Sequence, residues 1–310
     1  MSKLVNVGSL CIDFVYSVPL IAAAGETVAS IERQVFPGGK GLNQSIAAAR
    51  AGVSVHHFGA VGEDGDSLVG CLTDNGVDTT GVVRLAGASG HAVIQVDAQG
   101  RNAIVISGGT NRQLSEAHAS AAVAALEAGD WMLLQNETNH VGQIMQEAAD
   151  RGMSVALNVA PPDSRIFDYP IERLGLLVAN EHEAMYLAQN SAPELAFQAL
   201  KARCPDTHLV MTRGSEGLMF SEAGQADVYS MGAYAVRAVD ETAAGDAFVG
   251  YVLAGLVQSM PLVETLVRAS GAGACAVTQA GAAPSVPEAR AVDQLLNQQH
   301  RLVPSQIQVE

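Results

Sequence analysis

Residues 238–248 read Ala-Val-Asp-Glu-Thr-Ala-Ala-Gly-Asp-Ala-Phe and lead directly into an apolar segment. The pattern predicts the end of a strand over 236–240 and a buried helix over 246–256. Between them the Ala-Ala-Gly run carries almost no side chain, so the backbone can turn tightly and an anion can approach it closely. The first helical turn would direct unpaired N–H groups and the positive end of the helix dipole toward that anion. The stretch therefore predicts a phosphate site formed by the amides of Ala243, Ala244 and Gly245.

Asp246 follows the glycine directly and would lie beside the same anion. A carboxylate there repels a phosphate group, so its presence indicates a chemical task. The task that fits is to accept the proton of an attacking hydroxyl. Aspartate is also common in the first turn of ordinary helices, and Ala-Ala-Gly is an ordinary tight connection. The functional interpretation therefore needs a second motif.

The second motif is Gly-Gly-Lys-Gly-Leu-Asn-Gln at 38–44, which opens a helix expected over 45–51. Two glycines before a lysine suggest a backbone that comes close to a ligand while a cation and an amide side chain reach it. The motif is not a Walker A loop, because Lys40 is followed by glycine. It is not a G-x-G-x-x-G turn either, which counts against an NAD-linked oxidoreductase. Taken alone, a glycine-rich helix start without function remains open.

The composition restricts the kind of ligand. Of the 310 residues, 48% are hydrophobic, which is enough for one large α/β domain or two smaller ones with a sizeable core. Only 17 lysines and arginines oppose 32 acidic residues, and the net charge of −15 argues against binding to nucleic acid or to anionic membranes. We expect a protein that acts on small molecules. An anionic ligand would need backbone amides, a divalent metal ion and a few well-placed cations.

The cysteines and the N-terminal segment predict a cytoplasmic protein. An apolar run after Lys3 slightly resembles a signal peptide, but Asp13 interrupts it. No window is long and apolar enough to predict a transmembrane helix. The cysteines include no C-x-x-C pair and are typical of reduced core residues; they are Cys11, Cys71, Cys204 and Cys275.

From residue 114 onward, strand patterns alternate with helix patterns, which is typical of a parallel, doubly wound sheet. The expected strands are apolar on both faces and lie at 131–135, 154–158, 174–179 and 208–212, after an earlier strand at 4–9. Polar residues, and one glycine, follow their carboxyl ends, where open α/β sheets bind ligands. They are Asp13 after the first strand, then Asn136, Glu137, Asn158, Asn180, Glu183, Thr212 and Gly214.

The sequence Asn-Glu-His-Glu at 180–183 invites a metal interpretation. H-E-x-x-H is absent, so we expect His182 on the surface rather than at a zinc ion. Glu183, close to a phosphate site, could hold Mg²⁺ through water, because that ion prefers carboxylates and phosphates and retains several waters.

Shorter strand patterns predict a second sheet. Those at 92–96 and 103–106 flank an Asp-Ala-Gln-Gly turn, which is a hairpin signal. With strands near 14–20 and 28–36 they could form a small sheet, which we interpret as a lid. Near the C-terminus, 261–281 and then 287 to about 298 are expected to be helical, followed by a frayed polar tail.

The two motifs together, G-G-K-G-L-N at 38–43 and D-E-T-A-A-G-D-A-F at 240–248, resemble those of the PfkB sugar kinases and, within them, the ribokinases. The similarity covers nearly the whole chain and includes G-E-T-V at 25–28, A-N-E-H-E-A at 179–184, T-R-G-S-E-G at 212–217 and A-A-P-S-V-P at 282–287. It implies one ribokinase-like three-layer α/β domain over 1–310. Lid strands would be inserted from about 13–36 and 91–107.

The resemblance also implies a reaction, in which a hydroxymethyl hydroxyl of a sugar attacks the γ-phosphate of ATP and Asp246 is the base. It implies a homodimer formed through the lid, and both Mg²⁺ and a monovalent cation, usually K⁺. The residues that stand at positions of the family's sites fall into four groups. They are Asp13, Gly39, Lys40, Asn43 and Glu137 for the sugar; Asn180, Thr212, Gly214, Gly217 and Ser270 for the nucleotide; Glu183 for Mg²⁺; and Asp240, Thr242 and Ser285 for K⁺.

Three residues depart from the family pattern. Cys11 stands where ribokinases typically carry an asparagine that contacts ribose, Ser270 where a histidine often packs on adenine, and Glu241 in place of the usual threonine. The sugar is therefore left open, and a sibling kinase for another sugar, a sugar acid or a nucleoside is the nearest alternative. A sugar or nucleotide sensor that has lost catalysis is a further alternative, which the intact Ala-Ala-Gly-Asp motif disfavours.

Overall fold

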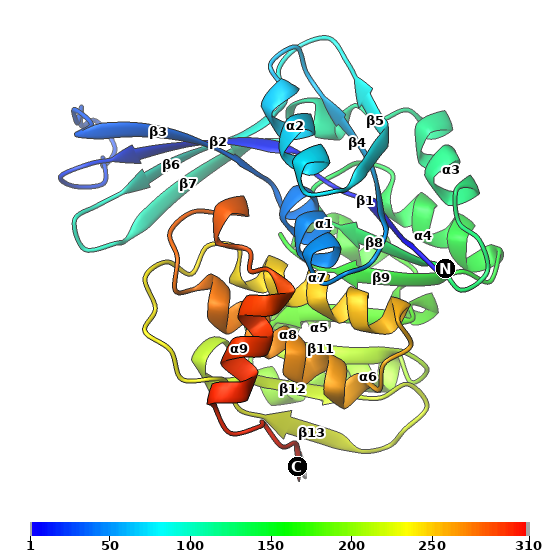
Figure 1. Cartoon of the computed structure of the whole chain (residues 1–310). Helices are drawn as coiled ribbons and strands as arrows, with labels where there is room; N and C mark the ends of the chain where they lie inside the picture. Colours follow the sequence, from blue (N-terminus) through cyan, green and yellow to red (C-terminus); the bar gives the residue numbers. More distant parts are fainter. Residues whose placement is uncertain (1, 308–310) are drawn as a thin grey trace.

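The strands of the central sheet carry apolar residues on both faces because helices cover both sides of it. In the computed structural model, which describes residues 2–307, β1 (Leu4–Val7) illustrates the pattern. Leu4 packs into one hydrophobic core, whereas Val5 and Val7 pack into a second core on the opposite face. The sheet therefore separates two cores, and the predicted three-layer α/β architecture is confirmed (Figure 1).

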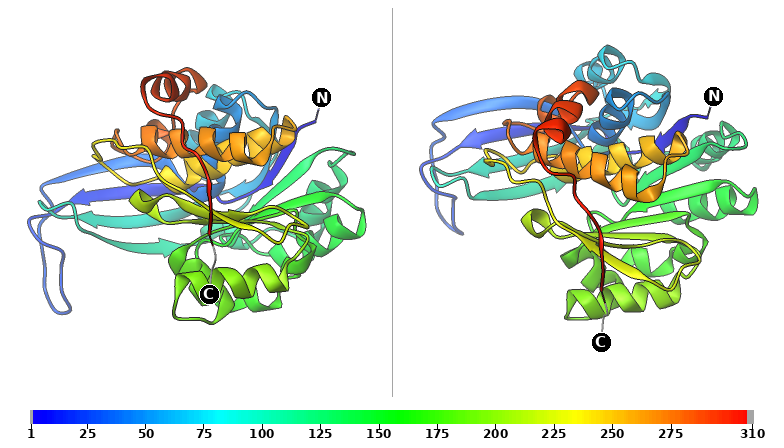
Figure 2. Two further views of the ribbon diagram at one scale, coloured as in Figure 1. Left: turned by 90° about the horizontal axis from the view of Figure 1, so that it is seen from below. Right: turned by 60° about the horizontal axis from the view of Figure 1, so that its bottom comes forward.

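The two helical layers lie on opposite faces of the sheet, as Figure 2 shows for the yellow and orange helices on one side and the green ones on the other. The first layer holds α1 (Lys40–Arg50), α2 (Asp66–Asp74), α7 (Ala244–Val257), α8 (Leu262–Ala276) and α9 (Ala289–Gln298). The second layer holds α3 (Glu116–Ala124), α4 (Val141–Asp150), α5 (Glu181–Ala188) and α6 (Pro193–Arg203).

The central sheet has the strand order β14-β13-β12-β11-β10-β9-β8-β1-β4-β5. Neighbours from β11 to β5 are parallel, and β12, β13 and β14 are added antiparallel. The chain proceeds from β1 to one side and from β8 to the other, so the strand order reverses between these two strands, where open sheets form ligand crevices. The remaining bounds are β4 (Val55–Val61), β5 (Asp78–Arg84), β8 (Trp131–Gln135), β9 (Ser154–Asn158), β10 (Leu176–Asn180), β11 (His208–Thr212), β12 (Leu218–Ser221), β13 (Val228–Met231) and β14 (Ser305–Ile307).

A small sheet projects from the main body (Figure 1). Its order is β3-β2-β6-β7, with β2 and β6 parallel and the other two pairs antiparallel. Phe14 pairs with Val35 on one side and Val93 on the other, and Val93 pairs with Val105. This apolar row crosses all four strands on the face opposite Asp13, because adjacent residues of a strand point to opposite faces. The bounds are β2 (Cys11–Ser17), β3 (Glu32–Gly38), β6 (Gly90–Val96) and β7 (Asn102–Ser107).

Short 3₁₀ helices occupy several connections. They are η1 (Gly109–Arg112), η2 (Ser164–Asp168), η3 (Ile171–Arg173), η4 (Gly214–Glu216) and η5 (Ala283–Ser285).

Helix α7 is buried along most of its length and lies against α1 and α8. Its glycines make this close packing possible. A Cβ at Gly250 would lie 2.7 Å from the carbonyl oxygen of Gln44 on α1, and one at Gly255 would clash with Thr265 on α8. The small residues of α7 thus fix the position of its N-terminal end relative to α1.

Several predicted boundaries were wrong. Residues 236–240 form no strand. They lie in a mostly exposed connection, in which the N–H groups of Val239 and Asp240 both donate to the carbonyl of Val277. Helix α1 begins at Lys40, five residues earlier than expected, and the strand expected over 28–36 begins only at Glu32. Part of the tail expected to fray, Ser305–Ile307, instead forms β14, which pairs with β13, while residues 308–310 lie outside the described part of the chain.

Among residues 2–307, no helix has the length and apolar character needed to cross a membrane.

Candidate active site

Helix α7 begins at a left-handed residue, Ala243, whose φ is 60°. Alanine adopts this conformation at a cost of roughly 1 to 2 kcal/mol, so the turn is imposed by its surroundings. No side chain caps this helix start. The N–H of Ala244 makes a long bond of 3.3 Å to the carbonyl of Glu241, whereas Gly245 opens onto a cavity. An anion at this helix start would find uncapped amides and a favourable dipole.

Asp246 lies in the first turn of α7 with only 8% of its surface exposed. Its Oδ2 accepts a hydrogen bond of 2.9 Å from Asn43 Nδ2, and its Oδ1 accepts one of 2.8 Å from Gln44 Nε2. Both donors lie on α1, so the two sequence motifs meet in space across about 200 residues of chain. The oxygen of the Asn43 amide, Oδ1, is buried without a partner among the described residues.

A cavity of about 200 Å³ lies above the start of α7. Glu241, Phe248 and Val249 line it as well, and the sequence had not indicated the last two as site residues. Residues predicted for different roles meet in it: Asn180 and Thr212 for the nucleotide, Glu183 for Mg²⁺, Lys40 for the sugar, Ala243, Gly245 and Asp246 for the phosphate site, and the strand-end residue Asn158.

Carboxylates outnumber cations around this cavity. Burial lowers the pKa of Lys40, but the carboxylates of Asp246, Glu137 and Glu183 outweigh burial and raise that pKa overall. Lys40 is thus a permanent cation in the site. Burial, together with the charge of Asp246, raises the pKa of Glu183.

Glu183 and Asn180 form the capping box of α5. The Asn180 side chain accepts from the Glu183 N–H at 2.9 Å, and Glu183 Oε2 accepts from the Asn180 N–H at 2.8 Å. Both residues therefore have a structural role besides any role toward a ligand. Within residues 2–307 no group of three or more histidine, cysteine or acidic side chains could hold a metal ion. Glu183 alone fits Mg²⁺, as a single carboxylate beside a phosphate site that leaves room for waters.

A second group of polar residues lies where β1 and β8 end. The hydroxyl of Ser9 donates to Glu137 Oε2, which also accepts from the Lys40 N–H at 3.2 Å. Burial raises the pKa of Glu137, although Lys40 partly opposes this. Burial, with the charges of Glu137 and Asp246, raises the pKa of Asp13 to about 7.

The glycines of the second motif let these groups approach. A Cβ at Gly38 would clash with the Asp13 carboxylate, and Gly39 has a φ of 97° and lies against the backbone of Ser9 and Cys11. The predicted sugar residues Asp13, Lys40, Asn43 and Glu137 thus lie near one another at the crevice between β1 and β8.

Two arginines hold the turn that carries Glu137. Arg112 donates to the carbonyls of Thr138 and Asn136 at 2.8 and 3.2 Å, and Arg165 donates to the same two carbonyls at 3.2 and 3.0 Å. Arg165 is in turn paired with Asp163 through Nε at 3.0 Å. The backbone on both sides of Glu137 is therefore fixed by two guanidinium groups.

Cys11 lies at the floor of the same region and is 6% exposed. Asn111 places its amide nitrogen 3.4 Å from the thiol and bonds both backbone groups of Leu10. Burial and the charges of Glu137 and Asp13 raise the pKa of Cys11 well above its ordinary value. The thiol is therefore neutral.

The residues predicted for K⁺ lie in one loop system. Asp240 Oδ1 accepts from the N–H and hydroxyl of Thr242 at 2.9 and 2.6 Å, and its Oδ2 accepts from the Gly281 N–H at 2.8 Å. Burial raises the pKa of Asp240, but these hydrogen bonds outweigh it and lower the pKa overall. Ser285 donates to the carbonyl of Ala282 at 2.9 Å and lies 3.4 Å from that of Thr242. An ionised carboxylate among backbone carbonyls suits a monovalent cation.

The other predicted nucleotide residues lie farther out. Gly214 begins η4 with a φ of 55°, and a Cβ at Gly217 would clash with the carbonyl of Met231, which is a structural reason for that glycine. Ser270 lies on α8 one turn before Gly273, whose Cα faces the start of α7. It therefore lies on the side of α8 that faces the site.

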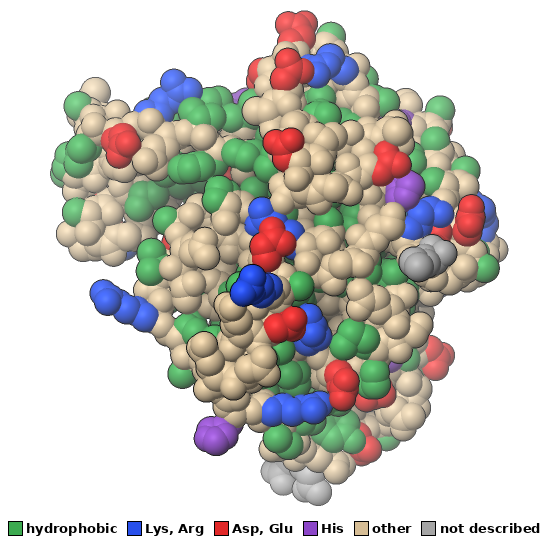
Figure 3. All heavy atoms as spheres, in the orientation of Figure 1, with side chains coloured by type: hydrophobic (Ala, Val, Ile, Leu, Met, Phe, Trp, Pro, Cys, Tyr) green, Lys and Arg blue, Asp and Glu red, His purple; other side chains and the backbone are tan. Residues whose placement is uncertain are grey.

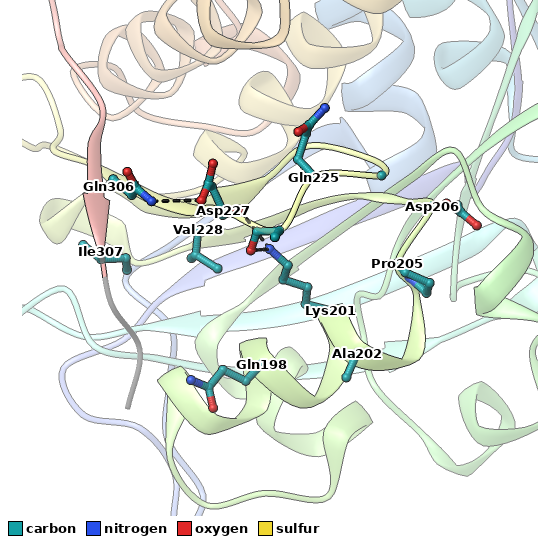
Figure 4. Close-up of a pocket in the computed structure, with 12 residues that line it drawn as sticks. Gln198, Lys201, Ala202, Pro205, Asp206, Gln225, Asp227, Val228, Gln306 and Ile307 are labelled. Atoms are coloured by element: carbon teal, nitrogen blue, oxygen red, sulfur yellow. Dashed lines mark hydrogen bonds between the residues drawn. The ribbon is translucent and has the colours of Figure 1, made fainter.

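A larger cavity, of about 620 Å³, lies at the far edge of the sheet between α6 and the β12–β13 turn (Figure 4). Lys201 spans it and donates to the backbone carbonyl of Asp227 at 2.9 Å, while Gln306 donates to the carboxylate of that aspartate at 2.9 Å. None of the residues of the two motifs lines it. The smaller cavity is the one that combines a carboxylate, a lysine and an uncapped helix.

This combination assigns the protein to the phosphotransferases. Transfer of a phosphoryl group depends mainly on positioning and on charge stabilisation, with a base for the attacking hydroxyl.

A model of the pfkB family of carbohydrate kinases matches residues 1–289, and the chain belongs to that family. It is 32% identical over 290 residues to a ribokinase of Haemophilus influenzae, an alignment that covers 90% of this chain and 94% of that protein. A ribokinase structure from Cryptococcus neoformans in complex with ADP superimposes with a TM-score of 0.85 at 29% identity, over 96% of this chain and 100% of that one. A structure of Arabidopsis thaliana ribokinase complexed with ribose and ATP gives 0.84 at 28% identity, over 96% and 99%. The protein is a ribokinase-like carbohydrate kinase.

Some site residues were not identified from the sequence. Gln44 and Ser9 contact Asp246 and Glu137 directly; Gln44 follows Asn43 in the second motif, whereas Ser9 lies outside both motifs, just after β1. Arg112 and Arg165 carried no sequence signal, because their role is to bind backbone carbonyls that only the fold brings near.

Proposed function

We propose that this protein transfers the γ-phosphate of ATP to the hydroxymethyl hydroxyl of a sugar, with ribose as the first candidate and Asp246 as the general base. The observation that carries the proposal is the Asp246 carboxylate, held by two amides of α1 at the uncapped start of α7. A carboxylate so placed is within reach of a hydroxyl that attacks a phosphate bound at the helix start.

In this mechanism the sugar lies between β2 and α1. Asp13 and Glu137 accept hydrogen bonds from its hydroxyls, and the unpartnered Asn43 Oδ1 accepts another. Asp246 takes the proton of the attacking hydroxyl as the oxygen bonds to phosphorus. The amides of Gly245 and its neighbours then stabilise the negative charge of the transferred phosphoryl group.

We assign the nucleotide to the cavity lined by Asn180 and Thr212, with Gly214, Gly217 and Ser270 around it; Lys40, which we assign to the sugar, also lines this cavity. Glu183 is the residue that fits Mg²⁺, which when bound neutralises phosphate charge. K⁺ would be held by Asp240, Thr242 and Ser285. Its binding would keep the loop before α7 in place.

The small sheet acts as a lid in this proposal, since Asp13 reaches the site from it and closure would exclude water. Its outer face supports a homodimer through the lid: Val35, Val93 and Val105 are 49%, 38% and 70% exposed, and apolar side chains gather over this sheet (Figure 3). An exposed apolar row of this kind is typical of an interaction surface. The four cysteines are free, which supports the cytoplasm as the compartment.

The identity of the sugar depends on Cys11. A neutral thiol offers a weaker hydrogen bond than an amide, so a sugar hydroxyl beside it would lose a contact. This observation favours, as the second candidate, a kinase of the same family whose sugar lacks or repositions that hydroxyl.

The test is ADP release from MgATP and K⁺ across ribose, deoxyribose, fructose, sugar acids and nucleosides. Turnover with ribose supports the first candidate and shows that Cys11 is tolerated. Turnover with another compound makes Cys11 a specificity residue. No turnover with any member of the panel would contradict the proposed kinase activity.

A further inference from the structure

A buried chain of polar side chains runs from the core to Asp246. His57, Ser45, Asn6, Gln135 and Gln44 are all fully buried. The hydrogen bonds are 2.8 Å between His57 and Ser45, 2.8 Å from Asn6 to Ser45, 3.0 Å from Gln135 to Asn6, 2.8 Å from Gln135 to Gln44 and 2.8 Å from Gln44 to Asp246. Such a network in an apolar core costs stability unless its members satisfy one another, so its position beneath the base calls for a reason.

At the inner end of this network, backbone carbonyls determine which side-chain atoms donate hydrogen bonds and which accept them. Burial lowers the pKa of His57 to about 4, so the ring is neutral and carries one N–H. Its Nε2 lies 3.2 Å from the carbonyl of Gly8, which can only accept, so Nε2 is the donor and Nδ1 accepts from the Ser45 hydroxyl. Asn6 Nδ2 likewise donates to the carbonyl of Gly41 at 2.9 Å, which turns Asn6 Oδ1 toward Gln135.

The orientation of the Asn6 amide then determines the orientations of the Gln135 and Gln44 amides, which lie nearer to Asp246. Gln135 meets two acceptors, Asn6 Oδ1 and Gln44 Oε1, with the same nitrogen, and its own Oε1 is left buried without a partner among the described residues. Reversal of this amide would place oxygen against oxygen at both contacts. Because Gln135 donates to Gln44 Oε1, the Gln44 nitrogen must point to Asp246 Oδ1 and to Asn158 Oδ1, at 2.8 and 2.9 Å.

We infer that Gln44 is a positioning residue for the catalytic base and that Gln135 and Asn6 lock its amide as a donor. The inference rests on the proposed role of Asp246. The fixed Gln44 amide holds the Asp246 carboxylate in one orientation against the charges around it. Four charged groups act on or near Asp246 from other elements: Lys40 from α1, Glu183 from α5, Glu137 from the turn after β8 and Asp13 from β2. A carboxylate in this acidic surrounding keeps one orientation only if its two oxygens meet fixed donors.

The decisive comparison is Gln135→Glu against Gln135→Met, since neither position 135 variant touches Asp246. The glutamate accepts where Gln135 donated, so the Gln44 amide turns over and presents its oxygen to Asp246. The methionine removes the donor without reversing the direction, and Asn158 still favours the native orientation. We expect Gln135→Glu to lower kcat about tenfold below Gln135→Met, a loss of the order of one hydrogen bond to a charged group. The KM for sugar and for ATP should change little.

The pH profile gives a second readout. In Gln135→Glu, and in Gln44→Glu, the acidic limb of kcat should move to higher pH by about one unit. Gln146→Glu on the exposed face of α4 adds the same charge and should leave the profile unchanged. If a position 135 variant does not fold, Gln44→Glu compared with Gln44→Met tests the same point. Equal kcat and equal pH profiles for the glutamate and methionine variants would overturn the inference.

Asp246→Asn distinguishes this failure from failure of the proposed function. If Asp246→Asn is inactive while the two position 135 variants behave alike, only the lock is refuted. If Asp246→Asn keeps its turnover, the base itself is wrongly assigned, and the inference fails with it.

Discussion

Asp13→Asn should make the protein more stable at pH 8 and hardly affect it at pH 4. The carboxyl has a pKa of about 7 in the folded protein, against 3.8 for the ordinary group, because of burial and the nearby charges of Glu137 and Asp246. A raised carboxyl pKa means that the folded state binds the proton more tightly than the unfolded state. Stability is therefore lost as the pH rises from about 4 to 7, and the loss is complete above 7.

The size of the effect follows from the two pKa values. At about 1.4 kcal/mol for each pKa unit, the ionised Asp13 costs on the order of 4 kcal/mol at pH 8 and less than about 1 kcal/mol at pH 4. The asparagine variant is not ionised and escapes this cost, so its free energy of unfolding should exceed that of the native protein by an amount that grows with pH.

Urea denaturation of both proteins at pH 4, 6 and 8 measures the difference directly. Asp206→Asn, at an exposed turn, is the matched control and should show no such pH dependence. The variant should also bind the sugar more weakly, because one acceptor is lost. A stability difference that is the same at all three pH values would refute the reasoning, since it would mean that Asp13 ionises no differently in the folded and unfolded states.

Three further predictions concern the site and its supports. Asp246→Asn should lower kcat at least about a hundredfold with little change in substrate binding, and steady-state kinetics that show near-native kcat would contradict its role as base. The double variant Arg112→Leu with Arg165→Leu should raise the sugar KM about tenfold and leave the ATP KM unchanged, because only the Glu137 turn loses its support; equal effects on both constants would point to general unfolding. Gly250→Ala should lower the free energy of unfolding by about 1 to 3 kcal/mol, measured in urea, because its Cβ meets the Gln44 carbonyl; an unchanged value would show that α1 and α7 can separate freely.

The fold was predictable from the sequence because its signals are local. Strands such as 131–135 and 208–212 are apolar on both faces and coincide with β8 and β11, and the alternation of strand and helix defined the doubly wound sheet. The antiparallel strands β12, β13 and β14, which extend the sheet beyond β11, are three or four residues long, too short to leave a pattern. β14 in particular is polar and forms only because β13 offers it an unpaired edge.

The site was predictable where one motif supplied both the backbone and the side chain, as with Gly245 and Asp246. Residues that act through packing were missed. The Gln44 side chain reaches Asp246 only because α1 lies against the glycines of α7. The local sequence does not reveal how closely these two helices pack. Arg165 binds carbonyls, which every residue possesses, so its partner could not be read from residue types.

The uncapped start of α7 links the stability of the protein to its ligands. Because the chain leaves the left-handed turn at Ala243 without a cap of its own, a bound phosphate group completes a helix that is otherwise unfinished. A ligand at a hundred times its dissociation constant adds about 2.7 kcal/mol to the free energy of unfolding. We therefore expect the resistance of the protein to heat and to proteolysis to increase when a phosphate-bearing ligand binds at this helix start.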